Sequence, residues 1–164
     1  PETIGDHRGF FARVFCREEF RAQGLDPDVE QCSVSYNSRR GTLRGMHWQV
    51  APHEETKLVR CTSGAIYDVI LDLRPASPTF RQWVATELSA DNRALVYVPR
   101  GCAHGFQTLV DASEVFYQMS EPFAPGFQGR VRFDDPAFGI AWPLPDPILS
   151  AADAAPASFA REMA

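Results

Sequence analysis

Short apolar segments separated by turn residues recur along the middle of the chain, and this spacing constrains the fold more than any other feature. Residues 65–73, AIYDVILDL, are rich in β-branched side chains and predict a core strand. Further strands are expected at residues 41–49, 57–61, 81–88, 94–98, 105–109 and 115–119. Many short strands divided by Gly, Pro and Asn turns indicate an all-β antiparallel sandwich or barrel.

The two ends of the chain carry other patterns. Residues 17–24 predict a short N-terminal helix that ends at Gly24. The segment beyond Phe123 is rich in proline and predicts an irregular C-terminal arm around the barrel, with a short helix from Ser150 onward. The glycine patterns of dinucleotide-binding and P-loop folds are absent, so a Rossmann domain is not expected. The length of 164 residues favours one domain spanning 1–164.

Composition limits the classes of partner and compartment. The chain has 16 basic and 21 acidic residues, a formal net charge of −5, which argues against a general nucleic-acid binder. No apolar run is long enough for a membrane-spanning helix, and no secretory signal pattern is visible. The four cysteines have no zinc-module spacing and are expected to be buried or semi-buried free thiols. These observations predict a cytoplasmic protein without a membrane partner.

Two of the four histidines lie in segments that suggest chemistry. His47 lies in residues 42–49, TLRGMHWQ, and His104 lies in residues 101–106, GCAHGF, between small residues after a turn. Strict alternation in a strand places Arg44 and His47 on opposite faces, unless Gly45 introduces a bulge. Jelly-roll metal sites normally offer a second His two residues after the first, but here that residue is Gln49, a poor ligand for transition metals. A metal site is therefore not expected.

Other polar residues stand in predicted strands. Asp68 and Asp72 are four residues apart in an apolar strand, so they share one face, and a buried Asp needs a partner such as His or Arg. Tyr117 also lies in a strand, where a tyrosine is more often a packing residue than a catalytic one. Lys57 is the single lysine beside 15 arginines, an imbalance that coding bias explains but that leaves one site for a compact ammonium group.

Several motifs together resemble a known family. They are residues 6–11 (DHRGFF), 43–49 (LRGMHWQ), 57–60 (KLVR), 68–74 (DVILDLR), 77–80 (SPTF), 88–90 (LSA), 99–106 (PRGCAHGF), 114–117 (EVFY) and 135–143 (DPAFGIAWP). Their order and spacing are similar to those of the dTDP-4-dehydrorhamnose 3,5-epimerase family. The resemblance implies a cupin-type jelly roll that works without metal or cofactor and binds a nucleotide sugar. It also implies a homodimer, in which an N-terminal strand is exchanged between subunits.

The resemblance assigns a role to individual residues. It implies that His47 is the base that removes a proton beside the 4-keto group and that Asp153 orients its ring. It implies that Tyr117 is the acid on the opposite face of the sugar, and that Lys57 lies beside the developing enolate oxygen. The residues expected to bind or line the substrate are Arg8, Phe11, Gln31, Arg44, Arg60, Asp68 and His104. Of these, Arg8 and Arg44 suit the diphosphate.

Some positions depart from the family pattern. Arg13 stands where the family usually has Glu, and residues 31–33, Gln-Cys-Ser, replace Gln-Asp-Asn, so recognition of thymidine is open. Phe123 replaces a second Tyr, which makes epimerisation at C3 alone an alternative to inversion at C3 and C5. A strand that precedes Asp6 in the family is absent from this sequence or trimmed.

Three other functions are compatible with the same motifs. A sugar-nucleotide 3,4-ketoisomerase would move protons beside a keto group but shift the carbonyl. A non-catalytic sugar-nucleotide-binding cupin would retain the pocket without turnover. A metal-dependent cupin oxygenase is the least favoured, because it would need a metal at His47 and His104.

Overall fold

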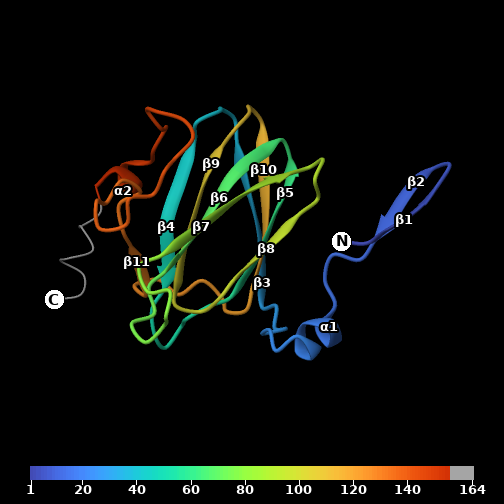
Figure 1. The fold of residues 1–164 in the computed structure, drawn as a ribbon, viewed down its shortest axis with the longest axis horizontal. Coiled ribbons are helices and arrows are strands. Elements are labelled where there is room, and N and C mark those ends of the chain that lie inside the picture. Colours follow the sequence, from blue (N-terminus) through green and yellow to red (C-terminus); the bar gives the residue numbers. More distant parts are fainter. Residues whose placement is uncertain (156–164) are drawn as a thin grey trace.

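Two antiparallel β-sheets face each other in a computed structural model that describes residues 1–155 (Figure 1). One sheet has the order β3-β10-β5-β8, from Gln31–Asn37, Ser113–Met119, Lys57–Ser63 and Leu95–Val98. The other has the order β11-β4-β9-β6-β7, from Gln128–Arg130, Leu43–Gln49, Cys102–Thr108, Ala65–Asp72 and Trp83–Ser89. The expected all-β jelly-roll sandwich is confirmed.

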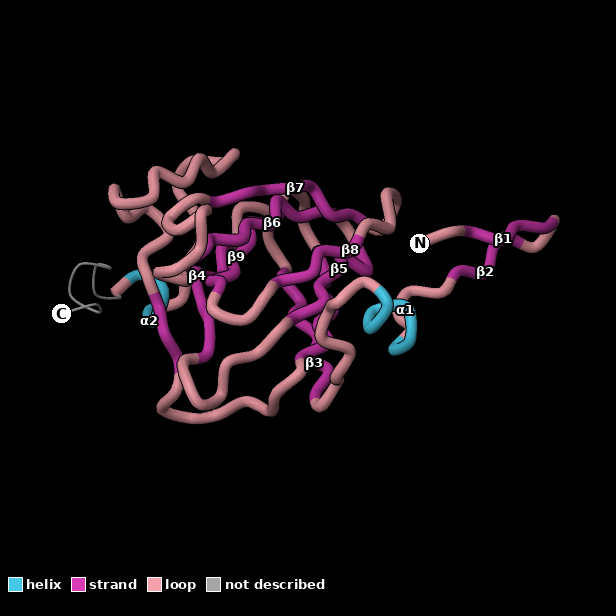
Figure 2. The backbone as a smooth tube through the Cα atoms, turned by 60° about the horizontal axis from the view of Figure 1, so that its bottom comes forward, coloured by secondary structure: helices cyan, strands magenta, loops and turns pink. Residues whose placement is uncertain are grey.

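Short elements flank the sandwich at both ends. The hairpin β1–β2 (Thr3–Asp6 and Gly9–Ala12) projects away from the body, and helix α1 (Arg17–Ala22) joins it to β3. Helix α2 (Ala151–Ala154) lies at the other end of the molecule, as Figure 2 shows. The short helices expected at 17–24 and from Ser150 onward are both present. Within residues 1–155, no helix is long and apolar enough to cross a membrane.

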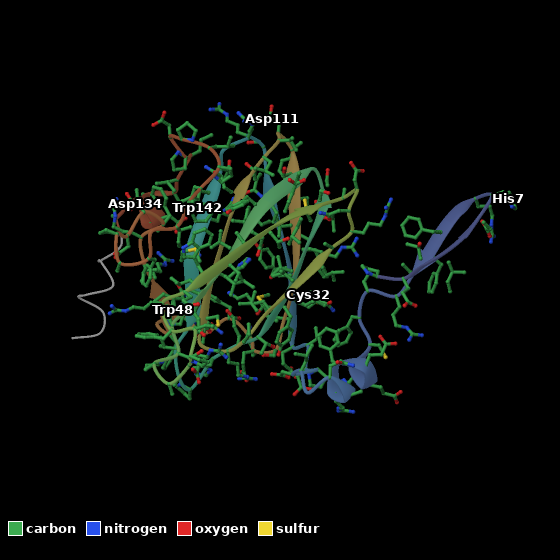
Figure 3. All side chains as sticks on the ribbon, viewed as in Figure 1. His7, Cys32, Trp48, Asp111, Asp134 and Trp142 are labelled. Carbon is green, nitrogen blue, oxygen red and sulfur yellow. The ribbon has the colours of Figure 1, made fainter. Side chains whose placement is uncertain are left out.

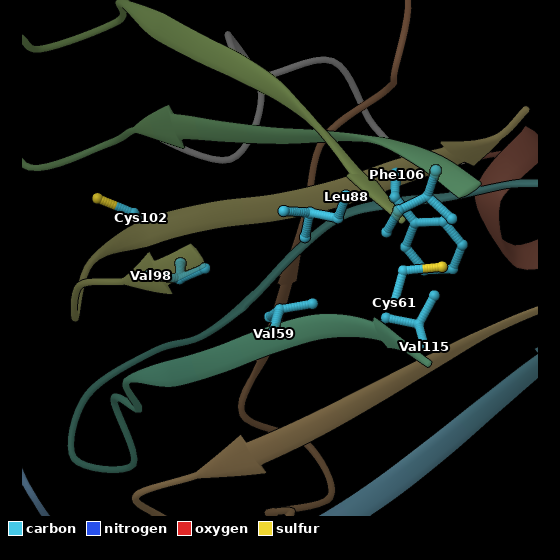
Figure 4. Packing of buried hydrophobic residues seen from close by; sticks show 8 residues of the cluster. Val59, Cys61, Leu88, Val98, Cys102, Phe106 and Val115 are labelled. Atoms are coloured by element: carbon cyan, nitrogen blue, oxygen red, sulfur yellow. The ribbon is translucent and has the colours of Figure 1, made fainter. Parts of the chain in front are cut away.

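Alternate residues of each strand fill two apolar clusters. The cluster between the sheets includes Val59, Ile66, Leu88, Phe106 and Val115 (Figure 4). A second cluster covers the outer face of the five-stranded sheet. It contains Met46, Val69, Leu71, Leu73, Ala103, Val131 and Phe138. Because its last two members come from the segment after β10, the expected irregular arm wraps the sheet.

The main differences from the expected elements lie near the chain ends. Strands β1, β2, β3 and β11 are not among the predicted strands, since their sequences carry no strong apolar alternation. Residues Thr3–Asp6 form β1, which ends within the motif at Asp6 and pairs with β2 of the same motif. Strand β9 begins at Cys102, so His104 lies inside the strand, not just after a turn. Four free cysteines are present as expected, but Cys32 lies exposed on the surface, as labelled in Figure 3.

A bulge in β4 resolves the conflict between Arg44 and His47. Arg44 pairs with Phe106 and His47 pairs with His104, so two residues of β4 face the single residue Gly105 of β9. Since Phe106 and His104 are two residues apart, their partners point to the same face of the sheet. The bulge includes Gly45, which has a φ of 136°. A Cβ atom at Gly45 would lie 2.5 Å from the Cα atom of Gly105.

Replacing Gly45 with Ala should lower the free energy of unfolding by roughly 2–5 kcal/mol. The added Cβ atom would overlap sterically with Gly105, and the alanine would have to adopt an unfavourable positive φ. Urea denaturation of the variant measures the loss. Gly41→Ala is the matched control, because Gly41 also has a positive φ, 83°, but a Cβ atom added there would meet no other atom within 4 Å. It should cost only about 1–2 kcal/mol. Equal losses in the two variants would contradict the steric argument.

Candidate active site

A cleft between the two sheets gathers most of the residues singled out in the sequence. It consists of two adjoining cavities of about 500 and 300 Å³, here called the inner and outer cavities. Both are lined by Ser33, His47, Lys57, Met119 and Phe123. The inner cavity adds Val34, Ser35, Arg44, His104, Phe106, Tyr117 and Asp153. The outer cavity adds Gln31, Trp48, Gln49, Glu55, Gln128 and Arg130.

His47 and Asp153 form a close pair at the cleft wall. Nε2 of His47 lies 2.5 Å from Oδ1 of Asp153, and the carboxylate is buried while the ring remains partly exposed. Ser150 caps helix α2 and donates its hydroxyl to the other carboxylate oxygen of Asp153, at 2.9 Å. Burial raises the pKa of Asp153, but hydrogen bonds with His47 and Ser150, together with the charges of His47 and Arg130, outweigh burial and leave the pKa lowered.

This pairing fixes the tautomer of His47. Because Asp153 stays ionised, its Oδ1 accepts a hydrogen bond from the N–H at Nε2 of His47. The lone pair of Nδ1 is then the basic site of the ring. No hydrogen bond links Nδ1 to any other residue in the part of the chain that the structure describes. The arrangement suits a general base.

A second histidine–carboxylate pair lies beside the first. Nε2 of His104 is 2.8 Å from Oδ2 of Asp68, and both side chains are buried. The expectation that Asp68 needs a His or Arg partner is confirmed. His104 is the cross-strand neighbour of His47, so the two rings lie side by side on one sheet. Oδ1 of Asp68 is buried without a hydrogen-bond partner among residues 1–155.

Tyr117 approaches from the opposite sheet. It lies on β10, and its ring meets the ring of His104 edge-on, with centroids 6.1 Å apart. Burial, with the negative charge of Asp68 adding to it, raises the pKa of the Tyr117 phenol well above its ordinary value near 10. Tyr117 therefore stays protonated, and His47 and Tyr117 present a base and an acid from two opposed walls.

The single lysine is buried in the cleft with its own counter-ion. Nζ of Lys57 lies 2.9 Å from Oε1 of Glu55, and the two side chains are only 13% and 8% exposed. Lys57 is the first residue of β5 and lines both cavities. Sequence reasoning missed Glu55, which shares a run of polar residues with Glu54. The pairing keeps an ammonium group inside the cleft, where an unpaired charge would be costly.

Two glutamines hold the rim of the outer cavity. Oε1 of Gln31 accepts a hydrogen bond from the backbone of Phe123 at 2.9 Å. Oε1 of Gln49 accepts one from the backbone of Ala124 at 2.7 Å. Gln49 thus has a structural role in the place where a metal-binding cupin has a ligand. Within residues 1–155, no group of three His, Cys, Asp or Glu side chains could hold a metal ion.

Four residues expected to bind or line the substrate are not among the residues that line this cleft. Asp68 is buried in its pair with His104, and the other three lie elsewhere. Arg8 is on the projecting hairpin and pairs with Asp6, and Phe11 on the same hairpin is 72% exposed. His7 marks the tip of this hairpin in Figure 3, far from the sandwich. Arg60 lies on β5 three residues after Lys57, so strand alternation places it on the outer face of the sheet. There it borders a hollow beside Phe10 and Arg93.

Comparison with known proteins gives a consistent result. A family model described as dTDP-4-dehydrorhamnose 3,5-epimerase matches residues 1–161. The chain is 43% identical to the dTDP-4-dehydrorhamnose 3,5-epimerase of Sinorhizobium fredii over 143 residues, which is 87% of this chain and 73% of the relative.

Solved structures with the same fold include enzymes of this kind. The structure of the Bacillus anthracis dTDP-4-dehydrorhamnose 3,5-epimerase, with TDP and pyrophosphate bound, superposes with a TM-score of 0.90 at 43% identity. That match covers 93% of this chain and 87% of the other. A 3'-monoepimerase from Streptomyces bikiniensis, in complex with dTDP-quinovose, gives 0.89 at 36% identity, with 98% and 81% covered.

The buried phenol of Tyr117 should not ionise in an alkaline titration. Its raised pKa predicts that Tyr117→Phe leaves the rise in tyrosinate absorbance up to about pH 11 unchanged. Ultraviolet difference spectra of the folded protein measure this. Tyr36→Phe is the matched control, since it removes a strand tyrosine that is 59% exposed. A loss of amplitude in Tyr117→Phe equal to that in Tyr36→Phe would show that the phenol is not protected.

Proposed function

The chain belongs to the dTDP-4-dehydrorhamnose 3,5-epimerase family and is a sugar-nucleotide epimerase with a cupin fold, and we propose that it inverts carbons of a nucleotide-linked 4-keto-6-deoxy sugar through an enolate. The proposed substrate is dTDP-4-dehydro-6-deoxy-D-glucose, with inversion at C3 and C5. The observation that carries the proposal is the opposition of His47 and Tyr117 across one cavity.

The first proposed step is removal of a proton next to the keto group. Nδ1 of His47 takes the proton from C3 or C5, and the electrons of the C–H bond form a carbon–carbon double bond. The electrons of the C4 carbonyl move onto O4, which becomes the enolate oxygen. Asp153 stabilises the imidazolium that results, since its carboxylate is 2.5 Å from Nε2.

The enolate then needs a positive group near O4. Lys57 is the only lysine of the chain, and its ammonium lines both cavities next to His47. A preorganised charge stabilises the enolate more than the ketone, so it lowers the barrier to proton removal. Glu55 holds this ammonium in place before substrate binds.

Reprotonation from the other face completes the inversion. Tyr117 donates its hydroxyl proton to the carbon on the side opposite His47, and the enolate returns to the ketone. A phenol with a raised pKa holds its proton until a strongly basic carbon forms beside it. Solvent then reprotonates the phenolate, and His47 releases its proton.

Inversion at C3 alone is the second candidate. Phe123 lines both cavities and has no hydroxyl, in a position where the family resemblance implies a second tyrosine. The Streptomyces bikiniensis relative is a 3'-monoepimerase. The two candidates share every step above and differ only in the number of carbons processed.

We also propose that the chain acts as a homodimer. The hairpin β1–β2 exposes Ile4 and Phe11, 74% and 72% exposed, and two-stranded hairpins are marginally stable in water on their own. Strand β3 is an unpaired edge of its sheet and borders the inner cavity through Ser33 and Val34. A hairpin from a second copy could add to this edge and bring its own Arg8 and Phe11 to the cleft.

Proton exchange is the direct test of the proposed chemistry. In deuterated water, turnover of dTDP-4-dehydro-6-deoxy-D-glucose should place deuterium at C3 and C5, or at C3 alone for the second candidate. Nuclear magnetic resonance of the product locates the label. His47→Ala should lower kcat by roughly 10²–10⁴-fold. His53→Ala is the control, because His53 packs on Phe127 and is not among the residues lining the cleft.

Three results would contradict this function. A product with a shifted carbonyl would identify a ketoisomerase. Tight binding of the sugar nucleotide without any deuterium uptake would identify a binding protein. Full turnover by His47→Ala would remove the proposed base.

Sedimentation tests the homodimer. The chain should sediment with twice its own mass, and Phe11→Asp should shift it towards the monomer, because a charge on the exposed hairpin opposes burial of that surface. Val84→Asp is the matched control, since Val84 is 66% exposed but lies on β7, away from the hairpin. A monomer for the unmodified chain, or equal dissociation of both variants, would overturn the arrangement.

A further inference from the structure

Two arginines of the cleft differ from the ion-paired arginines of the chain. The arginines that pair with carboxylates within the described residues include Arg8, Arg13, Arg17, Arg74, Arg100 and Arg132. Arg44 and Arg130 form no such ion pair there. Each is held instead by a neutral amide oxygen: Nε of Arg44 donates to Asn37 at 2.8 Å, and Nη2 of Arg130 donates to Gln128 at 3.2 Å.

The register of β11 places Arg130 beside the base. Arg130 is the cross-strand partner of His47, and Gln128 is the partner of Gln49, so both side chains share the face that lines the outer cavity. Arg130 is also close enough to Asp153 for its charge to help lower the pKa of that carboxyl. The guanidinium therefore lies at the mouth of the cleft, next to the reacting centre.

A neutral amide aligns a guanidinium without cancelling its charge. The hydrogen bond to Gln128 uses one of five N–H donors and leaves the others for a ligand. A carboxylate in the same place would neutralise the group and compete with an anion. Arg44, which the family resemblance assigns to the diphosphate, is held by Asn37 in the same way. Because both guanidinium groups are held by an amide oxygen, we expect Arg130, like Arg44, to bind an anion.

We propose that Arg130 is a second phosphate-binding residue of the cleft and that Gln128 is the residue that positions it. The inference rests on the proposed function, since the anion is the diphosphate of the sugar nucleotide. Along the sheet, the two guanidinium-bearing residues are separated by about 7 Å in the strand direction and about 5 Å between strands. Arginine side chains are long enough to converge on one diphosphate from these positions, with bidentate contacts to its oxygens.

Equilibrium binding of inorganic pyrophosphate tests the proposal without turnover. Isothermal titration calorimetry should show that Arg130→Ala weakens binding by roughly 10–100-fold, the loss expected for a charge-assisted hydrogen-bonded contact. Gln128→Glu should weaken binding in the same direction, because a carboxylate of the same shape then neutralises Arg130. Gln128 is exposed, so this change is compatible with folding. The effect of both variants should shrink at high salt.

Arg17→Ala is the matched control. Arg17 lies on α1, which Figure 1 shows at the opposite side of the sandwich from β11, and it is paired with Asp28. Its pyrophosphate affinity should equal that of the unmodified protein. Thermal denaturation of each variant checks that the fold is intact.

The outcomes separate this inference from the proposed function. Unchanged pyrophosphate affinity in Arg130→Ala overturns the assignment of Arg130. Weakened binding in Arg130→Ala with unchanged binding in Gln128→Glu overturns the positioning role of Gln128. Pyrophosphate binding that depends on Arg130, together with no deuterium uptake from any sugar nucleotide, would uphold the anion site while rejecting epimerisation.

Discussion

The contact between the backbones of Gly45 and Gly105 is the constraint on which the cleft depends. Two residues of β4 face one residue of β9 at this point, and only a position without a Cβ atom allows the strands to come so close. The extra residue turns Arg44 onto the face that carries His47 and His104. Without it, the guanidinium would point into the apolar cluster under the C-terminal arm, where Met46 and Leu71 pack. A steric feature of the backbone thus decides which charges the cleft contains.

Charge within the cleft follows a simple division. His47, His104 and Lys57 each have a carboxylate partner, and the side chains of these partners are at most 8% exposed. Groups that handle protons or meet a transient oxyanion are therefore fixed before a ligand arrives. Arg44 and Arg130 have amide partners instead, so their positive charge is available to an outside anion. In the cleft, the groups with carboxylate partners are suited to proton transfer and oxyanion stabilisation, and the two arginines with amide partners are suited to binding an anion.

The strands with strong apolar patterns could be predicted from the sequence, and so could the need of Asp68 for a histidine or arginine partner. Strand β3 could not, because its exposed and half-buried residues alternate without an apolar face that faces the core. Glu55, Asn37 and Gln128 were missed since a polar residue reveals its partner only in three dimensions. The placements of Arg8, Phe11 and Arg60 show the converse: a motif identifies residues, but the backbone decides which surface carries them.

Asp153 comes from a four-residue helix near the end of the described chain, whereas His47 comes from the middle of the sandwich. This order has a consequence for synthesis on the ribosome. Within the described residues, all strands of both sheets precede Asp153 in the chain, so they leave the ribosome before this carboxylate does. A nascent chain whose strands have emerged lacks the group that orients the imidazole of His47 until Asp153 emerges as well. The strands that form the sheets and the partner that orients His47 therefore become available at different times.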